Sequence, residues 1–502
     1  MLARLSAAAI LGVDAVPVSV EVDVSAGLPG VTMVGLPDAT VRESRDRVRS
    51  AIRNSGFPFP PDRVTVSLAP ADVRKVGAAF DLPIALGILA ASGALPYRDE
   101  VRYTIVGGLS LDGSIPPMRG LLPIAIGSRT SPGALVFPAA NVREAAIAAG
   151  LRLFPVRSLV EAACVLSSDD PVPAAPPDSA EVVPHEPVDD LADVRGQFVG
   201  RRALEVAAAG AHHLLFCGPP GTGKTMLARR LPGLLPQLSL DEALRVTAIH
   251  SVAGEIAPGS GLLRERPFRA PHHTCSDVAL VGGGSNPRPG ELSLAHAGVL
   301  FLDELPEFSR RVLETLRQPL EAGTVHIARA SRSVTFPAEV MLVAAMNPCP
   351  CGYFGSEVRA CRCPPSSVER YRGRLSGPLR DRFDLSLDLP GLDWAEMQGQ
   401  SPAESTLAVR NRILTARARQ LARQGCLNGR LGGRQLQAMC RMAPAADKLL
   451  GKGVTKLTLS VRAVTRVLRV ARTLADLEAS MEDLEARHVA EALQFRVQDA
   501  GL

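Results

Sequence analysis

Aromatic side chains and long apolar runs are both scarce in this sequence. Phenylalanine, tyrosine and tryptophan make up 4% of the 502 residues, so stacking on aromatic rings is not the expected way to hold nucleic-acid bases. The nearest approach to a membrane span, Leu82 to Leu95, is too short to cross a bilayer. The apolar start of the chain is also short, and Asp14 interrupts it, which argues against an export signal.

A disulfide framework is equally unexpected. The chain has nine cysteines, an odd number, which favours a reducing, cytoplasmic compartment over an oxidising one. The net charge of +5 permits a polyanionic partner without requiring one. A length of 502 residues with 46% apolar side chains predicts about two to four globular domains.

A glycine-rich segment near the middle of the chain has the pattern G-x-x-x-x-G-K-[ST]. It follows the apolar run 213–217 and precedes a helix-like stretch at 226–231. In that setting backbone N–H groups surround a polyphosphate, Lys224 reaches the outer phosphates, and Thr225 supplies a hydroxyl for Mg²⁺. The predicted ATP-binding residues are Gly218, Pro219, Pro220, Gly221, Thr222, Gly223, Lys224 and Thr225.

A second ATPase element is an apolar run that ends in two acids. The run 299–302 is typical of a strand buried on both faces, and Asp303 and Glu304 follow it. Asp303 is expected to hold Mg²⁺ and Glu304 to polarise the attacking water. The alternative is a buried strand followed by an acidic helix cap, but the upstream phosphate loop favours the ATPase interpretation.

Three further residues are candidates for the ATPase reaction. Asn347 follows the apolar run 340–346, so we expect it at the carboxyl end of a parallel strand, where it would orient the water or γ-phosphate. An Asn-Pro turn explains this residue equally well. Arg382 would act on a neighbouring subunit's nucleotide, with Arg380 as competitor and a structural Arg–Asp pair as the alternative. Arg462 begins a helix and would fold over the nucleotide within its own subunit.

Four cysteines in one loop form two C-x-C pairs. Their thiolates suit a tetrahedral structural Zn²⁺, which would hold together a loop too short for its own core. Unliganded or redox-active thiols are the alternative, because C-x-C is tighter than the usual zinc knuckle. The four candidates are Cys349, Cys351, Cys361 and Cys363. The remaining five cysteines are expected to be small core residues.

Two basic regions bear on a polyanionic partner. The helix predicted over 39–55 carries arginines at spacings of three and four, which indicates either a solvated or subunit-contacting face or a nucleic-acid surface. The basic, glycine-rich region formed by residues 267–274 and 282–290, together with a hairpin over 324–336, would line a central channel. In that region His272 and His273 are adjacent, so we expect them to hydrogen-bond or pack rather than to bind a metal together.

Other segments are assigned from periodicity and composition. Residues 167–190 are rich in Pro, Asp, Ser and Ala and predict an exposed linker. Alternating or continuous apolar runs predict strands at 16–24, 64–68, 104–111 and 133–138. Helical spacing predicts helices at 81–91, 123–128, 405–423, 460–476 and 481–498.

These motifs resemble the ComM (YifB) family of magnesium-chelatase-like AAA+ ATPases along nearly the whole chain. The resemblance implies a hexameric ring ATPase that uses ATP and Mg²⁺ to drive branch migration of DNA junctions. It also implies branched and single-stranded DNA, other copies of the chain and recombination proteins as partners, with a role in strand integration during natural transformation. The stretches that carry it are 27–29, 34–37, 80–86, 218–225, 269–274, 347–353, 376–385 and 470–477. The family's roles fall on Lys224, Thr225, Asp303, Glu304, Asn347, Arg382 and Arg462.

The N-terminal region resembles the proteolytic domain of Lon through residues 107–113 and 117–121. That chemistry needs a Ser nucleophile and a Lys base, but the corresponding positions are Ala79 and Leu122. We therefore expect a degenerate domain used for ring assembly or DNA contact, and an ATP-dependent protease is disfavoured.

The predicted fold is a multidomain α/β protein. The expected parts are a degenerate Lon-protease-like α+β domain (1–166), a linker (167–191), an AAA+ core with a parallel sheet and the Cys-rich loop 349–363 (192–391), and a helical lid (392–502). A DNA motor is the favoured function. A chelatase-type motor subunit that remodels a protein partner is the alternative.

Overall fold

The computed structural model describes residues 1–35, 39–71, 75, 77–96, 103–129, 133–175, 189–256, 261–284, 287–329, 332–356, 359–391, 404–480 and 483–496. The chain groups into two compact units. Unit 1 consists of Met1–Pro184, Leu240–Leu263 and Gly284–Pro289, and unit 2 consists of His185–Ser239, Arg264–Gly283 and Gly290–Leu502. Most of the predicted linker, residues 176–188, lies outside the described residues.

Unit 1 is built on a seven-stranded sheet in the order β3-β4-β2-β1-β5-β6-β7. The β1–β2 and β2–β4 pairs are antiparallel, and the other pairs are parallel. Val18, Val20 and Val22 are buried, which confirms the strand predicted from the alternation at 16–24. The strands are β1 (Leu2–Leu11), β2 (Asp14–Ser25), β3 (Gly30–Val34), β4 (Arg63–Ala69), β5 (Thr104–Ile105), β6 (Ala134–Pro138) and β7 (Arg152–Val156).

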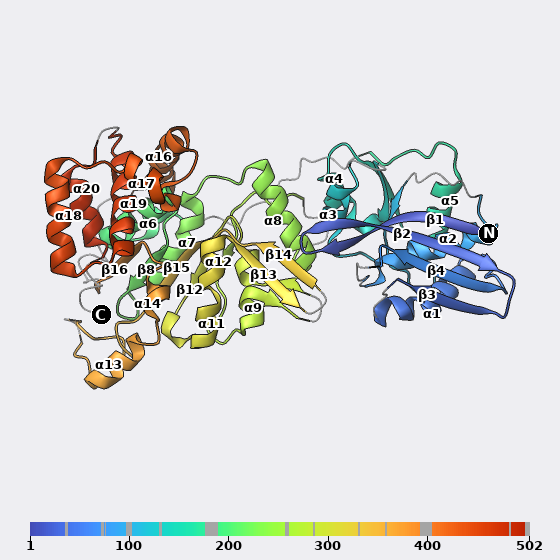
Figure 1. The fold of residues 1–502 in the computed structure, drawn as a ribbon, viewed down its shortest axis with the longest axis horizontal. Helices are drawn as coiled ribbons and strands as arrows, with labels where there is room; N and C mark the ends of the chain where they lie inside the picture. The colour runs from blue at the N-terminus through green and yellow to red at the C-terminus, as the bar shows by residue number, and fades with distance from the viewer. Residues whose placement is uncertain are drawn as a thin grey trace. The chain divides into compact units, whose positions relative to one another are not determined.

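The helices of unit 1 pack on this sheet or on one another (Figure 1). The central helix α2 packs against β1 and β2, and every one of its residues is buried. On α1 the side chains of Arg45, Arg49 and Arg53 are exposed, as the predicted basic stripe requires. The helices are α1 (Ala39–Asn54), α2 (Asp81–Ala91), α3 (Leu121–Gly127), α4 (Val142–Ala146), α5 (Leu159–Ser167) and α8 (Leu240–Ala253).

One strand prediction in unit 1 was wrong in length. The pattern predicted a strand over 104–111, but β5 ends at Ile105. Gly107 instead donates its N–H to the carbonyl of Ala79 at 2.9 Å and accepts from the N–H of Leu82 at 3.0 Å. These hydrogen bonds tie the backbone to the turn before α2, so the strand does not continue to residue 111.

Helix α8 follows the phosphate loop in sequence but folds with unit 1, where it contacts α3. The N–H of Gly120 donates to the carbonyl of Ser251 at 3.1 Å. The hydroxyl of Ser251 donates to Glu144, whose Oε1 also accepts from the N–H of Leu122 at 2.9 Å. A buried carboxylate thus joins α8 to the N-terminal region.

Unit 2 contains a five-stranded sheet in the order β16-β8-β15-β12-β9, and all its strand pairs are parallel. A separate antiparallel hairpin, β13 and β14, confirms the hairpin predicted over 324–336, and its tip at 330–331 lies outside the described residues. The strands are β8 (Leu214–Cys217), β9 (Phe268–Arg269), β12 (Val299–Leu302), β13 (Thr324–Arg329), β14 (Arg332–Pro337), β15 (Met341–Met346) and β16 (Leu385–Asp388).

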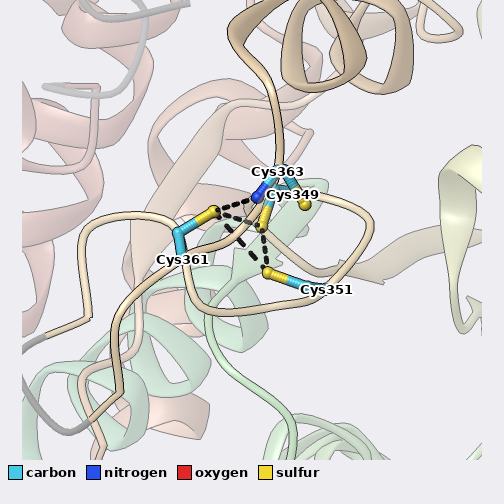
Figure 2. Close-up of side chains that lie close together, drawn as sticks. All are labelled: Cys349, Cys351, Cys361 and Cys363. Atoms are coloured by element: carbon cyan, nitrogen blue, oxygen red, sulfur yellow. Dashed lines mark hydrogen bonds between the residues drawn. The ribbon is translucent and has the colours of Figure 1, made fainter.

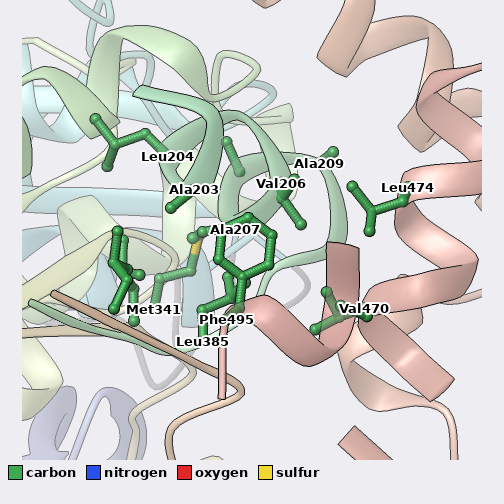
Figure 3. Packing of buried hydrophobic residues seen from close by; sticks show 14 of the residues in the cluster. Ala203, Leu204, Val206, Ala207, Ala209, Met341, Leu385, Val470, Leu474 and Phe495 are labelled. Atoms are coloured by element: carbon green, nitrogen blue, oxygen red, sulfur yellow. The ribbon is translucent and has the colours of Figure 1, made fainter. Parts of the chain in front are cut away.

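The C-terminal helices share one hydrophobic core with this sheet. Val206 on α6, Val470 and Leu474 on α19 and Leu385 on β16 belong to the same buried cluster (Figure 3). The helices are α6 (Phe198–Gly210), α7 (Lys224–Leu234), α9 (Asp277–Val281), α10 (Glu291–Leu294), α11 (Arg310–Thr315), α12 (Arg317–Ala322), α13 (Pro365–Arg372), α14 (Gly377–Arg380), α16 (Thr406–Gln424), α17 (Gly433–Met439), α18 (Pro444–Leu457), α19 (Val461–Leu477) and α20 (Ala486–Gln494). In the described part of the chain, no helix is long and apolar enough to cross a membrane.

Candidate functional site

The phosphate loop joins the buried strand β8 to the N-terminus of α7. Gly221 and Gly223 have φ angles of +83° and +84°, a backbone region in which side chains other than hydrogen are strained. Gly223 directly precedes the first residue of α7, so free N–H groups of the helix face the loop. This strand, glycine turn and helix N-terminus form an anion site of the kind that binds phosphate.

Lys224 lies across the loop. Its Nζ donates to the carbonyls of Gly218 and Pro219 at 2.7 and 2.8 Å and to Oδ1 of Asn347 at 3.2 Å. Burial lowers the pKa of this ammonium below its ordinary value, while the nearby Cys217 and Asp303 act in the opposite direction. The charged amine is thus held beside Asn347, which ends up next to the phosphate loop because β15 pairs directly with β8.

A hydroxyl and a carboxylate converge beside this amine. Thr225 Oγ1 donates to Asp303 Oδ2 at 2.7 Å, and Asp303 Oδ1 accepts from the N–H of Glu304 at 2.9 Å. Hard oxygen ligands of this kind suit Mg²⁺, which usually also keeps waters and phosphate oxygens in its shell. Thr225 and Asp303 therefore fit the ion that accompanies ATP, and such an ion would neutralise phosphate charge.

Glu304 stands just beyond these residues with a left-handed φ of +51°. Its Oε2 lies 3.1 Å from Nδ1 of His273, and its side chain is 55% exposed. The ring of His273 packs at 4.2 Å on that of His272 and at 6.4 Å against the edge of Phe308. The expectation that the histidines hydrogen-bond and pack is confirmed. The partnership with Glu304 was missed, because no local pattern connects the two positions.

Arg382 lies at the other end of the strands. It precedes β16, whose Leu385 pairs with Leu214 at the start of β8, whereas the phosphate loop follows the end of β8. A four-residue strand spans about 13 Å, so Arg382 lies on the edge opposite its own phosphate loop. Its Nη2 donates to Glu321 Oε2 at 2.6 Å.

Arg462 shares this edge with Arg382. The pKa of Glu321 is lowered mainly by the hydrogen bond and charge of Arg382, and the charge of Arg462 contributes as well. One helical turn further along α19, Arg466 lies 3.5 Å from Asp381. Arg382 and Arg462 thus both lie near Glu321.

The four cysteines of the loop after β15 converge (Figure 2). Their Sγ atoms all lie within 4.8 Å of one another, and three of the separations are 3.4, 3.6 and 3.6 Å. A tetrahedral zinc with Zn–S bonds of about 2.3 Å places its sulfurs about 3.8 Å apart. The donor set fits Zn²⁺.

The other five cysteines are not all core residues. Cys217 and Cys440 are buried, and burial raises the pKa of each thiol to about 12. Cys275 and Cys426 are partly exposed, and Cys164 on α5 is exposed, so the expectation of core positions was wrong for Cys164.

The resemblance to Lon would place a protease dyad on or near Ala79 and on Leu122. Ala79 lies in the turn before α2, where its carbonyl accepts from Gly107. The side chain of Leu122 is fully buried at the start of α3. Neither side chain has a group that ionises or attacks a carbonyl.

Three family models match in succession: subunit ChlI of Mg-chelatase over residues 20–141, magnesium chelatase subunit ChlI over 190–397, and its C-terminal model over 403–496. The chain is 44% identical to the YifB protein of Salmonella typhimurium over 499 residues, which are 99% of this chain and 97% of the relative. It is 44% identical to competence protein ComM of Haemophilus influenzae over 504 residues, with coverage of 99% and 97%.

A more distant relative is the Holliday junction branch migration complex subunit RuvB of Saccharopolyspora erythraea. It is 29% identical over 229 residues, which are 44% of this chain and 47% of RuvB. The similarity to ComM and YifB extends along nearly the whole chain, and the phosphate loop meets Asp303 and Glu304 at one edge of the sheet. This chain therefore belongs to the ComM/YifB family of magnesium-chelatase-like AAA+ ATPases.

Proposed function

We propose that this protein is a cytoplasmic, hexameric, ATP-driven DNA motor that promotes branch migration and strand integration in homologous recombination during natural transformation. The observation that carries the proposal is the meeting of Lys224, the Thr225–Asp303 pair, Glu304 and Asn347 at one edge of a parallel sheet. Ligands of such sheets bind at this edge. The relatives named competence protein and branch migration subunit point to DNA as the substrate of the motor.

In the proposed reaction each side chain has one task. Lys224 holds the outer phosphates, and Thr225 with Asp303 holds Mg²⁺. Glu304 takes the proton of the attacking water, and Asn347 orients that water or the γ-phosphate. Water must lie within hydrogen-bond reach of Glu304, and its Oε1 can accept from that water because His273 contacts only Oε2.

Arg382 and Arg462 are proposed to act on a neighbouring subunit's nucleotide. Support comes from their shared edge, opposite their own phosphate loop, and from Glu321, which is exposed and is the acid beside both. For Arg462 this replaces the role within one subunit that the sequence suggested. In a ring, guanidinium groups on one face of a subunit meet the phosphates on the opposite face of the next, where they stabilise the charge of the transition state.

The cysteine loop is proposed to hold a structural Zn²⁺ through Cys349, Cys351, Cys361 and Cys363. The convergence of four sulfurs supports this, because four thiolates without a metal would repel one another. Metal analysis of protein purified without chelators should give about one zinc per chain. A stoichiometry near zero would remove this part of the proposal.

The DNA motor is tested by the ATPase rate with and without a synthetic four-way or three-strand junction across a salt series. We expect the junction to raise the rate at low salt. The stimulation should decline as salt rises, because contacts to DNA phosphates release counterions. Absence of stimulation at every salt concentration would contradict a DNA motor.

A chelatase-type motor subunit that remodels a protein partner is the second candidate. The matches to magnesium chelatase subunit ChlI favour it. It predicts the same basal ATPase and no response to DNA, so the junction assay separates the two functions.

A further inference from the structure

The cysteine loop contacts the nucleotide site at two separate points. Its first cysteine, Cys349, is two residues beyond Asn347, whose Oδ1 accepts from Lys224 Nζ at 3.2 Å. A few residues later Gly352 lies directly against Pro220, the third residue of the phosphate loop. The loop therefore touches the phosphate loop near its beginning and holds Asn347 beside its lysine.

Gly352 is required at its position for two reasons. Its φ is +84°, in the region that favours glycine. A Cβ built there would lie 2.7 Å from Cδ of Pro220 and 3.8 Å from Cγ of Asn347. A carbon at 2.7 Å overlaps a rigid proline ring, and that ring is part of the phosphate loop, so any added side chain must displace one of the two loops.

The C-terminal end of the cysteine loop is fixed to the segment that contains Asn347. Helix α13 begins two residues after Cys363. From it the Nε of Arg372 donates to the carbonyl of Pro348 at 3.1 Å, and the buried Tyr371 hydrogen-bonds to the backbone of Asn347. The segment between Asn347 and α13 is thus a closed loop whose two ends meet at the nucleotide site, and the four sulfurs lie between those ends.

We propose that the metal-closed cysteine loop sets the position of the phosphate loop, with Gly352 as the positioning residue, so that metal occupancy of the four cysteines controls nucleotide affinity. This rests on the zinc proposal. A loop without regular structure has no ladder of backbone hydrogen bonds to hold its middle in place, and four thiolate bonds to one ion supply that crosslink. Loss of the ion frees Gly352 from Pro220 and leaves Asn347 less well placed.

The first test uses the full chain and a fluorescent ATP analogue at equilibrium. Cys361→Ser should lose zinc and bind the analogue roughly tenfold more weakly, since small misplacements at such sites have effects of this order or larger. Lys224→Ala gives the reference for lost binding. A Cys361→Ser protein that lacks zinc, melts cooperatively and binds the analogue as tightly as the parent would overturn the proposal.

The second test separates the contact from the metal. Gly352→Ala should keep its zinc and still bind the analogue more weakly. Gly355→Ala is the matched control, because Gly355 lies in the same loop with φ +76° but has nothing within 4 Å of an added Cβ. Equal affinity for the two alanine variants would overturn the proposal. A parent protein that contains no metal would refute the zinc site instead, so the two failures are distinguishable.

Discussion

The two units differ in how much of the hydrogen-bonding capacity of their carboxylates is used. In unit 1, Asp81 is fully buried, and its carboxylate accepts from Ser44 and from Arg47 Nε at 3.0 Å. In unit 2, Glu304 is more than half exposed and has one partner, His273. Groups that satisfy one another in the interior stabilise a fold, whereas a carboxylate with spare acceptor capacity beside a phosphate site can do chemistry.

The same contrast applies to the positions where catalysis would be expected. In unit 1, the resemblance to Lon would place a protease dyad at the apolar Ala79 and Leu122, and Leu122 contributes to the core instead. Unit 2 keeps a lysine, a hydroxyl and two acids at the carboxyl end of its strands. Catalysis is therefore predicted only for unit 2, and the following changes test this division.

The largest effect is expected for Arg382→Ala, which should lower kcat by about a thousandfold while nucleotide still binds. The reason is loss of positive charge at the neighbour's transition state. In rings assembled from a mixture of variant and parental subunits, the ATPase rate should fall more steeply than the fraction of parental subunits. Arg380→Ala is the control, two residues away. A rate proportional to the parental fraction alone would argue against action between subunits.

Glu304→Gln should bind ATP normally and lower kcat about a hundredfold, because the amide cannot accept the proton of water. Single-turnover hydrolysis together with analogue binding measures both quantities. Glu369→Gln, at an exposed position on α13, should leave the rate unchanged. Parental turnover by the Glu304 variant would show that another group is the base.

Asp81→Asn in unit 1 should lower the free energy of unfolding by about 2 kcal/mol, because Arg47 loses a charged, largely buried partner. The ATPase rate per folded molecule should stay at the parental value. Thermal melts and steady-state ATPase assays supply the two readouts. A large fall in rate without a fall in melting temperature would move unit 1 from a structural to a catalytic role.

The smallest effect concerns acid stability in unit 2. Burial alone would raise the pKa of Asp384, but the nearby His212, His213 and Arg469 together outweigh it and hold this pKa at about 2. The ionised carboxylate stabilises the fold above the ordinary pKa of about 3.9, and this is lost as pH falls toward 2. The melting-temperature difference between parent and Asp384→Asn should therefore narrow below pH 4. A constant difference would exclude this linkage.

Local patterns determined much of this protein from its sequence. The phosphate loop, the acids after β12, the hairpin and the fully buried helix at 81–91 each depend on neighbours along the chain. Such patterns can be recognised because hydrogen bonds within a turn or helix and side-chain periodicity along a strand are local. A ring, DNA and protein partners are expected from the family resemblance alone, because no periodicity reveals them.

Tertiary structure decided the relations between distant segments. His273 meets Glu304 and Gly352 meets Pro220 because parallel strands that are separated in sequence end at the same edge of the sheet, whereas Arg462 on α19 comes near Glu321, the partner of Arg382. The grouping of α8 with unit 1 is a fact of the same kind. These contacts depend on packing between elements whose separation along the chain varies freely, so sequence spacing carries no record of them.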